Sequence, residues 1–188
     1  LFLEDYSAKS WHRRRPYWEL GFEAASSTSR DFYLGNIGAG LGAKAGSIKG
    51  GLGSSSYFIE ELGITVGALV AVNSAGNVLF PETRTFYAWD CELNDEFGGI
   101  HPAKEINKEA ILLPKNTYSG QNTTLAVIAT DAELTKAQAR RLAIISQDGL
   151  GRAIRPAHTP LDGDIVFSIA TGRQKLKDTV RDLSLLEI

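Results

Sequence analysis

Apolar runs of strand length occur at residues 64–72, 125–129 and 165–170. They are rich in β-branched and aliphatic residues and are bounded by Gly, Asn, Asp or Thr, which is typical of buried strands that begin and end in turns. A shorter strand is predicted at residues 57–59. We expect residues 77–80 to return as the second arm of a hairpin after the strand at residues 64–72.

Helical spacing of apolar residues appears in two places. Residues 16–27 begin with a proline and carry an i, i+4 apolar pair, which predicts a core-facing helix. A second helix is predicted over residues 136–152, because Thr135 and Gln138 fit a capping box and the apolar residues that follow share one face. Strands and helices together indicate an α/β or α+β fold.

Glycine is dense between residues 35 and 53, so the backbone there must turn sharply or approach another segment closely. Gly38, Gly40 and Ala43 match part of a dinucleotide-binding fingerprint, but no strand-to-helix crossover surrounds them. Lys44 follows Ala43, where a phosphate-binding loop requires glycine before its lysine. A nucleotide site is therefore not favoured.

Composition indicates one ordinary domain: the chain has 188 residues and is 43% hydrophobic. Lys plus Arg number 20 against 22 Asp plus Glu, and the net charge of −2 gives no reason to expect nucleic acid or an anionic membrane as partner. No apolar stretch is long enough to span a bilayer. Cys91 is the sole cysteine, which excludes an internal disulfide and fits a reducing, cytoplasmic setting.

An acidic stretch contains four residues of the types that bind hard cations or form mixed metal sites, namely Glu92, Asp95, Glu96 and His101. These residues follow no recognisable ligand spacing, and a lone cysteine supports no Cys-based cluster. We interpret the stretch as a solvated acidic loop and expect no metal.

Candidate chemistry is concentrated where residues 120–124 lead into the apolar run at 125–129. Spacing alone favours an ordinary turn, since Gly, Asn and Thr are common there. The alternative is that the chain cuts itself between Asn122 and Thr123. Thr123 would then carry a nucleophilic hydroxyl and, in its new α-amine, a base with a pKa of about 7.7 to 8.0.

Other polar residues also allow two interpretations. Asn73 follows a predicted strand and is either a turn residue or an amide pointing into a pocket. Asp162 and Asp164 flank a glycine, which is common in turns, but on extended backbone both carboxylates would face one site. His158 has no acid at a fixed spacing and is interpreted as structural rather than as a catalytic base.

The order and spacing of several segments are informative together, although each is a weak motif alone. The segments are residues 35–40, 49–54, 65–73, 122–131, 134–137 and 162–164. They resemble the L-aminopeptidase/D-esterase family, which includes β-peptidyl aminopeptidases and the nylon-oligomer (6-aminohexanoate-oligomer) hydrolases. The resemblance implies a four-layer αββα sandwich of the N-terminal-nucleophile hydrolase type.

The resemblance also implies how the chain is organised. Residues 1–188 would form a single domain that cleaves itself into a larger chain, 1–122, and a smaller one, 123–188. The chain contains no Met, so we expect it to be a fragment that lacks the family's amino-terminal segment. A homo-oligomer, a tetramer of cleaved protomers, is expected as well.

In the mechanism implied by the resemblance, Thr123 attacks an amide carbonyl and its own amine takes the proton. Asn73 and a nearby backbone amide stabilise the oxyanion, while Asp162 and Asp164 position the amine. No metal or cofactor is required.

A lysine of the glycine-rich segment should add positive charge near the nucleophile. Lys49 is the first choice and Lys44 the reserve. Tyr6 and Glu4 are the candidates for substrate contact near the start of the chain.

The function implied is a self-processing amidohydrolase or aminopeptidase that hydrolyses short amides or peptides. Its substrates would be amino-terminal residues, β- or ω-amino acid amides, or nylon oligomers. One alternative is an acyltransferase like the ornithine acetyltransferases, which resemble this group in their Thr nucleophile and fold. The other is an uncleaved, non-catalytic binding module.

Overall fold

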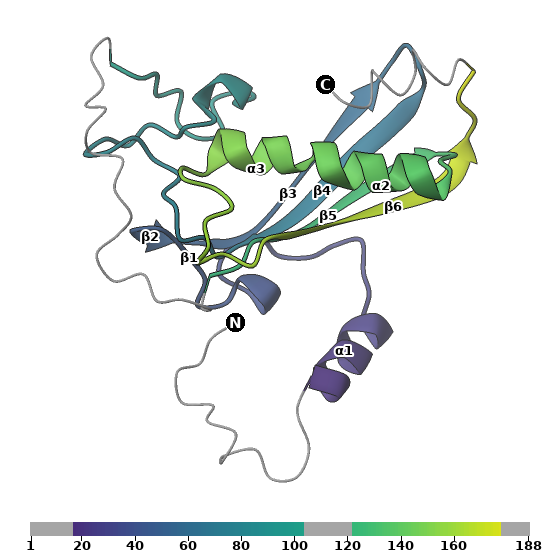
Figure 1. Cartoon of the computed structure of the whole chain (residues 1–188), viewed down its shortest axis with the longest axis horizontal. Helices are drawn as coiled ribbons and strands as arrows, with labels where there is room; N and C mark the ends of the chain where they lie inside the picture. The colour runs from purple at the N-terminus through teal and green to yellow at the C-terminus, as the bar shows by residue number, and fades with distance from the viewer. Residues whose placement is uncertain (1–16, 104–121, 178–188) are drawn as a thin grey trace.

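The computed structural model describes residues 17–103 and 122–177 (Figure 1). The helices in these ranges are α1 (Tyr17–Ser26), η1 (Gly38–Gly40), η2 (Trp89–Cys91), α2 (Lys136–Ile145) and α3 (Gln147–Ala153). The strands are β1 (Lys44–Ala45), β2 (Ile48–Lys49), β3 (Gly51–Ile59), β4 (Ile64–Val72), β5 (Leu125–Ala132) and β6 (Ile165–Gln174).

A mixed four-stranded sheet, in the order β3-β4-β5-β6, is the centre of the fold. β3, β4 and β5 pair in antiparallel fashion, and β5 pairs with β6 in parallel. A parallel pair needs a crossover, and here α2 and α3 supply it, lying along one face of the sheet (Figure 1). The α+β class predicted from the sequence is confirmed.

The capping box predicted at the start of α2 is present. The Thr135 hydroxyl oxygen accepts the Gln138 N–H at 3.3 Å, and the Gln138 side chain accepts the Thr135 N–H at 2.7 Å. The single helix predicted over residues 136–152 is instead divided into α2 and α3 at Ser146. The Ser146 hydroxyl donates to the Leu142 carbonyl at 2.7 Å, a local bond of the kind that bends helices.

The predicted hairpin between β4 and residues 77–80 is wrong. Both edges of β4 are occupied, by β3 and by β5, so no edge remains for another strand. Residues 77–80 instead make isolated bridges, Asn77 with Arg155 and Leu79 with Phe86.

Close backbone approach explains part of the glycine density. Gly35 exchanges backbone hydrogen bonds with Leu52 of β3, at 2.7 and 2.8 Å. A Cβ atom on Gly40 would lie 2.4 Å from the Leu52 nitrogen, and one on Gly51 would lie 2.8 Å from the Gly35 carbonyl. Only glycine permits these contacts. β3 begins at Gly51, six positions before the strand predicted at 57–59, because Gly51 pairs with Val72 of β4.

The two faces of the sheet differ in what covers them. On the helix side, the Ser168 hydroxyl of β6 donates to the Ala139 carbonyl of α2 at 2.6 Å. On the other side, Leu69, Val127 and Phe167 are register partners across β4, β5 and β6, and so share a face. Leu69 is 36% exposed and Phe167 is 57% exposed, so this face is apolar and open among the described residues.

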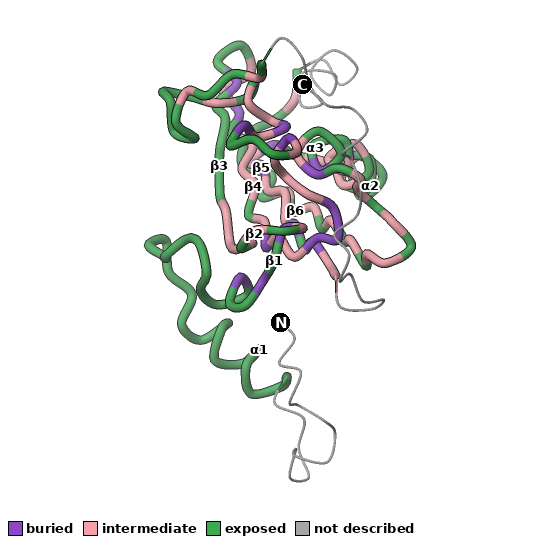
Figure 2. The backbone as a smooth tube through the Cα atoms, turned by 90° about the vertical axis from the view of Figure 1, so that its left-hand side faces the viewer, coloured by how far each residue is buried: buried purple, intermediate pink, exposed green. Residues whose placement is uncertain are grey.

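Helix α1 forms as predicted, but the prediction that it faces the core is wrong. None of its residues is buried, and both views show it apart from the sheet (Figures 1 and 2). Trp18 and Phe22 stack on each other, with ring centroids 5.5 Å apart, and both side chains are exposed. Helical spacing predicts an apolar stripe but not the surface against which it packs. No helix in the described ranges is long and apolar enough to cross a membrane.

Candidate active site

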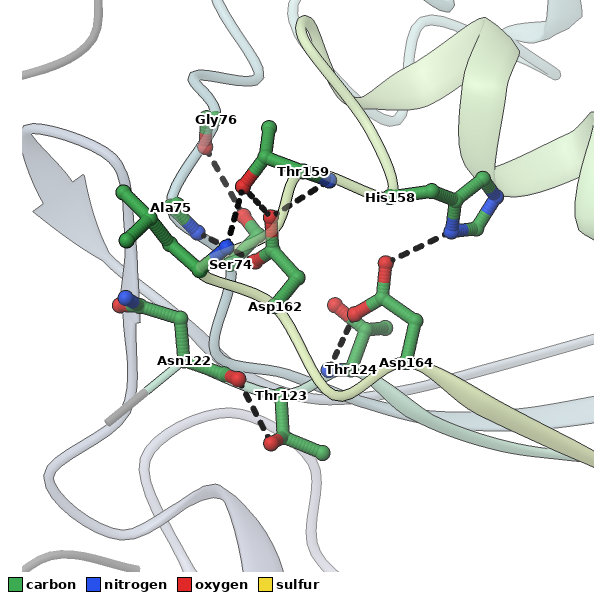
Figure 3. Close-up of polar contacts among 11 residues, drawn as sticks. Ser74, Ala75, Gly76, Asn122, Thr123, Thr124, His158, Thr159, Asp162 and Asp164 are labelled. Carbon is green, nitrogen blue, oxygen red and sulfur yellow. Dashed lines mark hydrogen bonds and ion pairs between the residues drawn. The ribbon is translucent and has the colours of Figure 1, made fainter. Parts of the chain in front are cut away.

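Thr123 lies just before β5, and backbone hydrogen bonds fix the chain on both sides of it. Its N–H donates to the Asn73 carbonyl at 2.6 Å, and the next carbonyl, of Thr124, accepts the Ile165 N–H at 3.0 Å. Asn122, on the other side, forms a parallel bridge with Asp162 (Figure 3). Thr123 is therefore fixed at the start of a strand.

The Asn122 carbonyl oxygen accepts hydrogen bonds from two directions. The Thr123 hydroxyl donates to it at 2.6 Å (Figure 3), and the Gly163 N–H donates to it at 2.9 Å. The Thr123 hydroxyl thus lies beside the carbonyl of the peptide bond that self-cleavage would break. A hydrogen bond to a carbonyl oxygen also polarises it for attack.

Asp164 is buried and holds the backbone of Thr124, the residue that follows Thr123. Its Oδ1 accepts the Thr124 N–H at 2.8 Å, and its Oδ2 lies 2.8 Å from His158 Nδ1. The Asp164 side chain is 4% exposed, against 41% for His158. A buried carboxylate needs such partners, because desolvation is costly when its oxygens are not hydrogen-bonded.

Asp162 ties a neighbouring turn to the segment after β4. Its Oδ1 accepts the Ala75 N–H at 2.9 Å, while its Oδ2 accepts the Thr159 N–H at 3.2 Å and the Thr159 hydroxyl at 2.5 Å (Figure 3). Asp162 and Asp164 therefore come together at one site on either side of Thr123. In this uncut chain the Thr123 N–H is bound by the Asn73 carbonyl.

The predicted lysines lie together beside Asn73. The Asn73 side-chain oxygen accepts the backbone N–H of Lys44 at 3.0 Å, and Lys44 is the register partner of Lys49 in the β1–β2 pair. Cross-strand partners point to the same side, so the two exposed ammonium groups share a face. The remaining candidates, Tyr6 and Glu4, lie outside the described residues.

A packed cluster supports the segment after Asn73. Asn77 and Arg155 exchange backbone hydrogen bonds at 3.0 and 2.8 Å, and the Arg155 guanidinium lies 4.6 Å from the Tyr87 ring centroid. Burial raises the pKa of the Tyr87 hydroxyl above its ordinary 10.0, and the charge of Arg155 partly opposes this rise. The cluster is a cation–π support rather than a reactive group.

The acidic stretch forms a loop, as interpreted from the sequence. One Glu92 oxygen accepts the N–H groups of Phe97 and Gly99, at 2.5 and 3.0 Å. Within residues 17–103 and 122–177, no group of three or more His, Cys, Asp or Glu is placed to hold a metal ion.

Gly163, Thr159 and His158 contact the site, but the sequence did not single them out as functional. Gly163 contributes a backbone N–H, which has no residue-type signature. The pattern of Thr159 and Asp162, a hydroxyl three residues before an acid, is a local turn signal that could have been found. His158 pairs with an acid only six positions away, but no fixed spacing marks such pairs.

Comparison with known proteins relates this chain to a known family. Residues 2–187 match the family model described as Peptidase family S58. An uncharacterised aminopeptidase of Mycobacterium tuberculosis is 46% identical over 161 residues, which cover 84% of this chain and 46% of that protein. A beta-peptidyl aminopeptidase of Sphingosinicella microcystinivorans is 30% identical over 146 residues, covering 76% of this chain and 35% of that protein.

A solved structure is similar as well. The L-aminopeptidase D-Ala-esterase/amidase of Ochrobactrum anthropi, described as a variant of the Ntn hydrolase fold, superposes with a TM-score of 0.52 and 27% identity. The match covers 81% of this chain and 36% of that one. The chain thus spans less than half the length of these relatives.

Proposed function

Because the chain belongs to peptidase family S58, we propose that it is part of a self-processing amidohydrolase with Thr123 as the amino-terminal nucleophile. The observation that carries the proposal is the 2.6 Å hydrogen bond from the Thr123 hydroxyl to the Asn122 carbonyl. Cleavage of this peptide bond would divide a single domain into residues 1–122 and 123–188. An ordinary turn does not need a hydroxyl that donates to the carbonyl of the residue before it.

In the proposed turnover, the new α-amine of Thr123 takes the hydroxyl proton as the oxygen attacks an amide carbonyl. An acyl-enzyme forms, and water then releases the acyl group. The Asn73 carbonyl, which accepts the Thr123 N–H in the uncut chain, is placed to hold the amine after the cut. We assign the Asn73 side-chain amide to the substrate oxyanion.

The acidic and basic candidates are proposed to act around Thr123 and Asn73. We propose that Asp162 and Asp164 position the amine, because they fix the segments on either side of Thr123. Their negative charge would stabilise the ammonium that forms when the amine takes the hydroxyl proton. Lys49 is proposed to supply positive charge near the nucleophile, with Lys44 as the reserve.

The proposed substrates are short peptides and amides, including amino-terminal residues and β- or ω-amino acid amides. We propose no nucleic-acid or membrane partner, a cytoplasmic location, and a homo-oligomer of cleaved protomers. These proposals rest on the net charge of −2, the single cysteine and the resemblance to the family.

Denaturing mass spectrometry of the full-length protein tests the proposal. The wild type should give two separate chains, one that ends at Asn122 and one that begins at Thr123. Thr123→Ala should give one intact chain. Thr124→Val is the matched control, because the Thr124 hydroxyl is buried without a hydrogen-bond partner in the described part of the chain. This variant should fold and be cut normally. A folded wild type that remains intact would overturn the proposal and favour an uncleaved module.

A further inference from the structure

We propose that the backbone N–H of Gly163 is the oxyanion donor for the self-cleavage step. The inference rests on the proposed self-processing. It assigns the stabilisation of the oxyanion in that step to a backbone group rather than to a side chain. It follows from the two hydrogen bonds that meet at the Asn122 carbonyl oxygen.

The chemistry requires a donor at that oxygen. The Thr123 hydroxyl oxygen bonds to the Asn122 carbonyl carbon, and negative charge develops on the carbonyl oxygen. The hydroxyl proton moves to the Thr123 nitrogen as the carbon–nitrogen bond breaks, leaving an ester and a free α-amine. Water then hydrolyses the ester to the Asn122 carboxylate and the Thr123 hydroxyl. The attacking hydroxyl cannot remain a donor, so the Gly163 N–H, at 2.9 Å, must hold the charge.

The turn that carries this N–H is fixed before the reaction begins. The Asp162 N–H donates to the Thr159 carbonyl at 2.9 Å, and the Asp162 carboxylate holds Ala75 and Thr159. On the other side of Gly163, the buried Asp164 carboxylate holds the Thr124 N–H. A donor fixed in this way stabilises developing charge without a reorganisation cost.

Glycine at this position leaves room for the Thr123 hydroxyl. A Cβ atom on residue 163 would lie 3.0 Å from the Thr123 hydroxyl oxygen, tighter than ordinary van der Waals contact. Glycine thus lets the hydroxyl and the backbone N–H approach the same carbonyl oxygen.

A backbone ester at residue 163 tests the donor without adding a side chain. Glycolic acid, incorporated in place of Gly163 by codon suppression during cell-free synthesis of the full-length protein, replaces the N–H with oxygen. The matched control is glycolic acid in place of Gly63, whose N–H donates to the Ile59 carbonyl at 2.9 Å in the turn between β3 and β4, outside the site. Cleavage is followed over time on denaturing gels. We expect the Gly163 ester to be cut about 10²- to 10³-fold more slowly than the wild type. The control should be cut at close to the wild-type rate.

The outcomes separate this inference from the proposed function. If the Gly163 ester and the control are cut equally fast, while Thr123→Ala stays intact, the inference is overturned and the proposed function stands. If the wild type itself stays intact, the proposed function fails. Hydrogen exchange in uncut Thr123→Ala needs no ester and no cleavage. The Gly163 N–H should be protected there, and exchange at the rate of an exposed loop would overturn the inference.

Discussion

At the scale of single residues, Asp162 and Asp164 act on backbone N–H groups. The sequence predicts that carboxylates two positions apart face one site on extended backbone, and the structure places both beside Thr123. Their individual partners, Ala75 and Thr124, depend on which strands meet, and that is set by non-local pairing.

Replacing Asp164 should separate its charge from its structural contact. Asp164→Asn keeps an oxygen that can accept the Thr124 N–H but removes the negative charge, so turnover should fall far more than stability. Asp164→Ala leaves the Thr124 N–H without its partner and should cost about 1–3 kcal/mol in the free energy of unfolding. Steady-state kinetics and urea denaturation of the cleaved protein measure the two effects.

Asp131 provides the matched control for this prediction. Its Oδ1 accepts the Thr65 N–H at 2.8 Å, a contact of the same kind between β5 and β4. Asp131→Asn should leave turnover unchanged. Wild-type kinetics in folded Asp164→Asn would reduce Asp164 to a purely structural role.

The site also shows where sequence reasoning ends at this scale. Thr123, Asn73 and the two aspartates could be singled out as candidates, because the order of the motifs marks their residue types. Gly163 could not, since its contribution is a peptide N–H that any residue except proline has. His158 was interpreted as structural, and its contact with Asp164 connects it to the site.

At the scale of elements, the apolar pattern of the sequence predicts strands and helices correctly where the observed packing agrees with that pattern. The run at residues 64–72 is β4, and its β-branched and aliphatic residues are typical of strands. The glycine- and serine-rich first half of β3 has no such pattern and is a strand because it pairs with β4. The predicted hairpin failed because β5, from far along the chain, occupies the edge of β4.

The capping box gives a prediction at this scale. Thr135→Ala removes the oxygen that accepts the Gln138 N–H and should lower the free energy of unfolding by about 1 kcal/mol. Urea denaturation measures the loss. Thr135→Ser keeps the oxygen and should retain most of the stability. Self-cleavage should be unchanged in both variants, and a cleavage defect in folded Thr135→Ala would show that α2 helps to position the site.

At the scale of the whole molecule, the described residues account for part of the predicted sandwich. They form one helical layer on one face of a four-stranded sheet, while Leu125, Phe167 and Ile169 remain exposed on the other face. The predicted four-layer arrangement would pack a second sheet on this apolar face. The local sequence pattern could not have predicted that architecture. The prediction came from the family resemblance, which covers most of the chain.

Substrate class is the prediction that belongs to the whole protein. A nucleophile whose base is its own amine needs no metal, so activity should survive EDTA and dialysis. A substrate with a free amino end needs an acid to pair with its ammonium group. Of the available acids, Asp162 and Asp164 already bind backbone N–H groups, which leaves Glu4 and its neighbour Asp5, with Glu4 as the first candidate.

We therefore expect the full-length protein to hydrolyse amino-acid p-nitroanilides, short β-peptides or 6-aminohexanoate oligomers in EDTA, and to spare folded proteins. Thr123→Ala should be inactive on every substrate. Glu4→Gln should raise KM for substrates with a free amino end, with little change for their N-acetylated forms, because only the ammonium contact is lost. Cleaved, folded protein that is silent on this panel but transfers acetyl from acetylornithine to glutamate would be an acyltransferase, since the same acyl-enzyme would then react with an amine in place of water.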